Sequence, residues 1–113
     1  MLGFECIGTM SSDCTTPYYF SMDHPYSVKD FIEDMLAQFP NEWGHIQLYK
    51  RGEIWGKNIV QCEYEYGRLK TSLPEKYMNR EVYMAEAWAG FSRMDIVLTL
   101  QTKGFESWNT EVH

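Results

Sequence analysis

Two periods of hydrophobic and polar residues run along this chain, and the longer one predicts a helix. Between residues 27 and 39 the apolar residues recur at i, i+3, i+4, i+7, i+8 and i+11, which places them on one side of an α-helix. These residues are Val28, Phe31, Ile32, Met35, Leu36 and Phe39. Ser27 is suited to cap the first turn, and Tyr26 is spaced to pack against Phe31. Pro40 ends the helix, because a proline ring disfavours the helical conformation of the residue before it.

A period of two predicts strands in most of the remaining chain. We expect strands at residues 2–6, 18–22, 45–50, 54–66, 69–71, 81–89 and 93–101, a loop at 8–17, and a single helical turn at 73–78. Strands that precede and follow one helix, joined by short connections, predict an α+β fold. We expect a mainly antiparallel sheet of about five to seven strands, with the amphipathic helix (27–39) packed on one face.

The strand at 81–89 predicts which face the helix covers. One side of it carries Tyr83, Ala85, Ala87 and Ala89, and the other carries Val82, Met84, Glu86 and Trp88. A helix approaches a sheet closely only over short side chains, so we expect the alanine side to lie under the helix. Residues 1–103 are expected to form a single domain. Residues 104–113 carry no period and are expected to form a mobile tail.

The charge balance limits the classes of partner. The 113 residues include 16 acidic and 10 basic ones, a net charge of −6, whereas binding to nucleic acid phosphates relies on clustered Lys and Arg. We therefore expect no direct nucleic acid binding. An acidic surface suits a basic protein partner, including a groove that otherwise holds DNA or RNA, although the same charge also serves solubility alone.

Targeting signals and cysteine usage point to the cytoplasm. The first residues lack the basic and apolar regions of a signal peptide, and no apolar run approaches the ~20 residues that span a bilayer. Three cysteines without a CxxC pair favour reduced thiols. The spacing of His and Cys residues predicts no metal site, and no motif predicts a cofactor.

One pair of residues invites an enzymatic alternative. A thiolate nucleophile needs a nearby imidazole, and Cys14 with His24, next to Asp23, could supply both for a small thiol-dependent hydrolase. No family signature surrounds Cys14, and Pro25 is a sufficient reason for the turn at His24. Our leading expectation is therefore a protein that is not an enzyme.

The side of the sheet away from the helix is the better candidate for function. Glu63, Glu65 and Glu86 are expected there beside Trp88 and Trp55. Carboxylates mixed with exposed aromatic rings are typical of protein-binding surfaces. Two alternatives remain open: the tail covers Trp88, or the chain forms a homodimer or structural subunit through an edge strand or this same face.

Several short strings resemble a known group of proteins. They are Asn41-Glu42-Trp43-Gly44, Tyr64-Glu65-Tyr66-Gly67-Arg68-Leu69, Leu73-Pro74 and Phe91-Ser92-Arg93-Met94-Asp95. Together they resemble short uncharacterised proteins of phages and conjugative elements of gut bacteria, over residues 27–101. That group has no assigned catalytic residues. The resemblance implies a mobile-element inhibitor or regulator that binds a host protein, as anti-CRISPR proteins do.

Overall fold

A seven-stranded mixed sheet forms the body of the protein. The computed structural model describes residues 2–6, 16–51, 59–90 and 92–101. The strands are β1 (Gly3–Cys6), β2 (Thr16–Ser21), β3 (Trp43–Lys50), β4 (Val60–Glu65), β5 (Arg68–Leu69), β6 (Val82–Ala89) and β7 (Met94–Leu100), and the helices are α1 (Val28–Gln38) and α2 (Glu75–Met78). The expected α+β fold, with its mainly antiparallel sheet, is confirmed.

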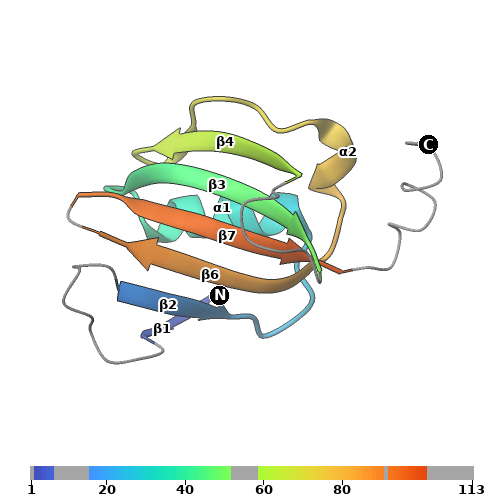
Figure 1. Cartoon of the computed structure of the whole chain (residues 1–113), viewed down its shortest axis with the longest axis horizontal. Helices are drawn as coiled ribbons and strands as arrows, with labels where there is room; N and C mark the ends of the chain where they lie inside the picture. The colour runs from blue at the N-terminus through green and yellow to red at the C-terminus, as the bar shows by residue number, and fades with distance from the viewer. Residues whose placement is uncertain (1, 7–15, 52–58, 91, 102–113) are drawn as a thin grey trace.

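The strand order explains the single parallel pair. The order is β1-β2-β6-β7-β3-β4-β5, and every neighbouring pair is antiparallel except β3 and β7. Figure 1 shows α1 behind the sheet, between β2 and β3 in the chain. A helix that crosses a sheet returns the chain in its original direction, so β3 runs parallel to β2. The β6–β7 hairpin lies between these two strands, and β7 therefore meets β3 in parallel.

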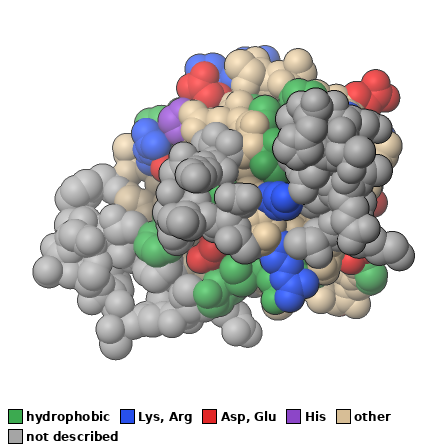
Figure 2. Space-filling view, turned by 45° about the vertical axis from the view of Figure 1, so that its right-hand side comes forward, with side chains coloured by type: hydrophobic (Ala, Val, Ile, Leu, Met, Phe, Trp, Pro, Cys, Tyr) green, Lys and Arg blue, Asp and Glu red, His purple; other side chains and the backbone are tan. Residues whose placement is uncertain are grey.

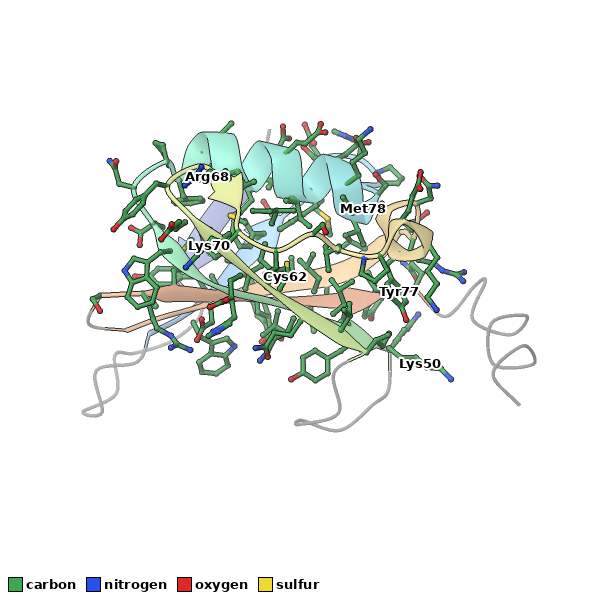
Figure 3. All side chains as sticks on the ribbon, turned by 90° about the horizontal axis from the view of Figure 1, so that it is seen from above. Lys50, Cys62, Arg68, Lys70, Tyr77 and Met78 are labelled. Carbon is green, nitrogen blue, oxygen red and sulfur yellow. The ribbon has the colours of Figure 1, made fainter. Side chains whose placement is uncertain are left out.

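The helix forms where the longer period predicts it. The Ser27 hydroxyl accepts a hydrogen bond from the Asp30 backbone N–H at 3.1 Å, and the Tyr26 ring packs edge-on against Phe31 with centroids 6.3 Å apart. The side chains of Val28, Phe31, Ile32 and Met35 are buried. Each contributes roughly 1.5–3 kcal/mol by leaving water, which is what holds α1 on the sheet. Figure 3 shows α1 lying along one face only.

A bulge in β6 corrects the expected face of that strand. Ala85 and Ala87 are fully buried in the same core as Phe31 and Met35, as expected. The register shifts between Val82 and Met84, however. An extra residue reverses the alternation on one side of a bulge, so Val82 is buried and Tyr83 is exposed. The assignment of these two side chains to their faces was therefore wrong.

The edge of the sheet at β5 is shorter than expected. The strand expected at 54–66 ends at Glu65, because Tyr66 and Gly67 both adopt positive φ angles in the turn to β5. Beyond the two residues of β5, the Thr71 hydroxyl accepts the Glu63 backbone N–H at 2.9 Å. Because the Thr71 side chain pairs with β4 where a partner strand would otherwise lie, fewer backbone groups of β4 are left unpaired at this edge of the sheet. Thr16 and Pro17, which were expected in a loop, belong to β2. The features expected at 8–15, 54–58 and 104–113 lie outside the described residues.

Candidate functional site

The face of the sheet away from α1, called here the outer face, collects the polar and aromatic side chains of five strands. It is the face turned to the viewer in Figure 1 and the lower side in Figure 3. Alternation along the paired strands places on it Tyr19 of β2, Trp43, His45, Gln47 and Tyr49 of β3, Gln61, Glu63 and Glu65 of β4, Glu86 and Trp88 of β6, and Asp95, Val97 and Thr99 of β7. The other face packs against α1.

Four of the five residues expected on this face lie there. Glu63 and Glu65 come from β4, and Glu86 and Trp88 from β6. Glu63 is exposed, and the other three are half-buried. Trp55 lies outside the described residues. Their role in binding a partner stays a prediction. In the view of Figure 2, the acidic, basic and hydrophobic side chains of the described residues are mixed. The acidic side chains visible there form no continuous area.

A hydrogen-bonded group around Asp95 occupies one part of the outer face. Asp95 Oδ1 accepts the backbone N–H of His45 at 2.9 Å, across the parallel β3–β7 pair. Asp95 Oδ2 accepts from the Arg93 guanidinium, with Nη2 at 2.8 Å and Nε at 3.1 Å. The Arg93 and Asp95 side chains are therefore an ion pair joined by two hydrogen bonds. Through the hydrogen bond to His45, the Asp95 side chain links β7 to β3.

The same group fixes the tautomer of His45. Arg93 Nη2 lies 3.1 Å from His45 Nδ1, and a guanidinium can only donate. A neutral His45 in this contact therefore accepts at Nδ1 and carries its proton on Nε2, which lies 3.7 Å from Glu63 Oε1. Sequence reasoning missed His45, because it is 50 residues from Asp95 in the chain. Only the strand order brings the two together.

The carboxylate of Glu86 differs from that of Asp95 in its burial and in its lack of a partner among the described residues. It lies in the middle of β6, paired across the sheet with Tyr19 on one side and Val97 on the other. Burial alone raises its pKa above the ordinary value of 4.5. Within residues 16–51, 59–90 and 92–101, neither a basic side chain nor a hydrogen-bond donor reaches its carboxylate. A half-buried carboxylate without a partner costs stability.

Exposed aromatic rings lie on three strands of the sheet, β2, β3 and β6. Tyr19, Trp43 and Tyr83 are 38%, 36% and 41% exposed. The Arg51 guanidinium lies over the Tyr83 ring, 3.9 Å from its centroid. Aromatic rings at this exposure bring large contact area at a low cost in side-chain entropy, which is why they are common at the centre of protein interfaces.

Of the two residues in the enzymatic alternative, the structure describes only His24. His24 Nδ1 lies 2.7 Å from Asp23 Oδ1, and its ring stacks on Tyr26 with centroids 4.1 Å apart. Cys14 lies outside the described residues, so its pairing with His24 stays a prediction. Cys62 is buried in the core, where burial raises the pKa of its thiol to about 11 and removes it as a nucleophile at neutral pH.

The part of the chain that the structure describes contains neither a metal-site cluster nor a membrane-spanning helix. Among the described residues, no group of three or more His, Cys, Asp or Glu side chains is arranged to hold a metal ion. In the same part of the chain, no helix has the length and apolar character needed to cross a membrane.

Comparison of the chain with known proteins gives no match. No family model, no curated protein and no solved structure is similar to it. The candidate site therefore rests on its own geometry.

Proposed function

We propose that this chain is a non-enzymatic protein-binding module, and that its outer face binds a basic protein. The observation that carries the proposal is the composition of that face: exposed aromatic rings lie among carboxylates, while α1 covers only the opposite face. Tyr49 and Val97 of the outer face are buried, whereas the rings of Tyr19, Trp43 and Tyr83 stay partly exposed. Exposed rings of this kind support a contact with another molecule, because aromatic side chains are enriched at the centre of protein interfaces.

Charge indicates the chemistry of the partner. The outer face carries the carboxylates of Glu63, Glu65, Glu86 and Asp95. The Arg93 guanidinium is already paired with Asp95, and Lys70 lies 4.0 Å from Glu65. The excess of negative charge agrees with the net charge of −6 for the chain. Complementary charge on the partner would raise the rate of encounter and fix the orientation of binding.

The resemblance to proteins of mobile elements suggests a biological setting. We propose an inhibitor or regulator, similar in kind to anti-CRISPR proteins, that occupies a basic groove of a cytoplasmic host protein. Such a groove normally holds nucleic acid phosphates, and a carboxylate-bearing sheet presents charge of the same sign. Competition between this chain and nucleic acid for the partner follows from this arrangement.

The test is capture of host proteins on the immobilised chain, compared between two charge-matched variants. Glu63→Gln with Glu86→Gln removes two charges from the outer face, and Asp30→Asn with Glu33→Gln removes two from the exposed side of α1. We expect a captured protein that is retained by the α1 variant and lost by the outer-face variant. Elution should begin between about 0.1 and 1 M salt, because the screening length falls from about 10 Å to about 3 Å.

Two results would contradict the proposal. Equal capture by both variants would remove the outer face as the binding surface, and capture unchanged by salt would remove the electrostatic contribution. Light scattering of the chain alone covers the homodimer alternative, since a dimer lost in the outer-face variant would assign that face to self-association.

A further inference from the structure

The imidazole of His45 lies between one cation and two carboxylates on the outer face. Its Nδ1 is 3.1 Å from Arg93 Nη2 and 3.6 Å from Asp95 Oδ1, and its Nε2 is 3.7 Å from Glu63 Oε1. The His45 side chain is 25% exposed, so it can exchange protons with solvent. The ring can form one of two sets of contacts, and its charge decides which.

The neutral ring favours the contact with Arg93. A guanidinium only donates, so Nδ1 has to be the nitrogen without a proton in this contact. Nε2 then carries the proton of the neutral ring. Asp95 Oδ1 accepts the His45 backbone N–H at 2.9 Å, and in this state it receives no hydrogen bond from the ring. The contact with Arg93 therefore requires an uncharged imidazole.

Protonation makes this contact unfavourable and favours two others. An imidazolium has an N–H on each nitrogen and no acceptor, so Nδ1 would meet the Arg93 guanidinium as a second donor of the same charge. The two carboxylate oxygens become acceptors after a shift of less than about 1 Å, because charge-assisted hydrogen bonds are about 2.7–2.9 Å long. Arg93 can stay on Asp95 Oδ2, which is the oxygen that the ring does not use.

The charged side chains beside His45 come from the strands on either side of β3. Among the described residues these side chains are Arg93 and Asp95 from β7 and the position before it, and Glu63, Glu65 and Lys70 from β4 and the position after β5. Lys70 lies 4.0 Å from Glu65, and Arg93 is paired with Asp95. Three carboxylates against two cations leave one negative charge, which favours a ring that becomes cationic.

We propose that His45 is a pH-operated switch of the outer face, in which the neutral ring accepts from Arg93 and the protonated ring donates to Asp95 and Glu63. Histidine is the side chain that ordinarily changes charge between pH 5 and 8. The exchange adds one positive charge to the outer face and gives Glu63 a partner. Weaker binding of a basic protein at low pH follows from it, and this consequence alone rests on the proposed function.

The test is nuclear magnetic resonance of the full chain labelled with heavy nitrogen, which distinguishes the two nitrogens of each imidazole. At pH 8 we expect the proton of His45 on Nε2, with this tautomer exceeding the other by about tenfold, because Nδ1 accepts from a charged donor. Both nitrogens should become protonated towards pH 5. His24 is the internal control, because its Nδ1 lies 2.7 Å from Asp23 Oδ1 and should carry the proton of the neutral ring.

Two variants assign the contacts. Arg93→Ala removes the donor, so the neutral ring should lose its preference for a proton on Nε2 and should donate from Nδ1 to Asp95. Glu63→Gln removes an acceptor of the charged ring, so protonation should require a lower pH. Glu33→Gln, on the exposed side of α1, should leave the transition unchanged. The amide spectrum of each variant verifies that the fold is kept.

Three results would overturn the switch: a proton on Nδ1 of His45 at pH 8, an unchanged tautomer in Arg93→Ala, or an unchanged transition in Glu63→Gln. All three are measured in the free chain, so they are separate from the capture experiment. If the outer-face and α1 variants capture host proteins equally, the proposed function is wrong and the switch can still hold. If capture depends on the outer face but His45 fails these measurements, only the switch is wrong.

Discussion

Asp95 and Glu86 carry carboxylates on adjacent strands of the same face, and they differ in whether those carboxylates have hydrogen-bond partners. Asp95 accepts hydrogen bonds from the His45 backbone and from the Arg93 side chain. Glu86 has neither kind of partner among the described residues, and burial raises its pKa. The Asp95 carboxylate joins β7 to β3, so its contribution to the stability of the fold accounts for its presence. The Glu86 carboxylate lowers stability, which is consistent with the binding role that we propose for the outer face.

The largest expected effect comes from forcing apart the strands that Asp95 joins. A Cβ at Gly44 would lie 2.3 Å from the Met94 carbonyl oxygen and 2.9 Å from Asp95 Oδ1. Because the nearest atoms are backbone, Gly44→Ala should lower the free energy of unfolding by about 3 kcal/mol, at the upper end for overpacking. Urea denaturation measures it. Gly90→Ala is the control, since its Cβ would meet nothing within 4 Å; equal losses in both variants would refute this account of β3 and β7.

A smaller loss is expected when the Asp95 carboxylate is removed. Asp95→Ala leaves the His45 backbone N–H without its acceptor, which should cost about 1–3 kcal/mol of unfolding free energy. The exposed Arg93 pair adds little to this. Asp95→Asn keeps an acceptor oxygen and should recover most of the loss. If Glu86→Ala is as destabilising as Asp95→Ala in the same denaturation experiment, the contrast between the two carboxylates does not hold.

The smallest effect, of opposite sign, is expected at Glu86. Its folded-state pKa is raised, so the protonated carboxyl is the form that folding favours. That contribution is fully present below about pH 4.5 and is lost as the pH rises through the raised pKa. Glu86→Gln should therefore be more stable than the unsubstituted chain at pH 7, by less than about 1 kcal/mol, and match it near pH 4.

Thermal unfolding of both chains from pH 4 to pH 8 measures this difference, and Glu33→Gln repeats the loss of one charge at an exposed position. Tyr19 faces Glu86 from β2, and Val97 faces it from β7, with Asp95 as the nearest charged residue on that strand. A gain that is independent of pH would mean that repulsion from the overall negative charge, not burial of Glu86, sets the stability of this part of the sheet.

The elements with a strong period could be predicted from the chain alone. The stripe from Val28 to Met35 specifies α1, because no other regular structure places those side chains on one side. The alternation in β7 likewise specifies a strand with Ile96 and Leu98 in the core. The face of Tyr83 was predicted wrongly, because a bulge inserts a residue that leaves no mark in the sequence.

The candidate site could be predicted only in part. Glu86 and Trp88 share a face, as do Glu63 and Glu65, because residues two apart in a strand always do, and each of these pairings needs no knowledge of strand order. The difference between Asp95 and Glu86 does need it. Whether a carboxylate has a partner depends on which strands lie beside it, and β3 joins β7 only after α1 has crossed the sheet.

The sequence alone thus determined the helix, the alternating strands, the single buried face and the surplus of negative charge, all of which follow from local spacing and composition. Tertiary structure alone decided that His45 meets Asp95 and that β3 and β7 are parallel. It also decided that Glu86 lies between Tyr19 and Val97, with no partner for its carboxylate among the residues that the structure describes. The physical reason is that local periods specify which side chains are turned inward, whereas hydrogen bonds between distant residues depend on which strands become neighbours.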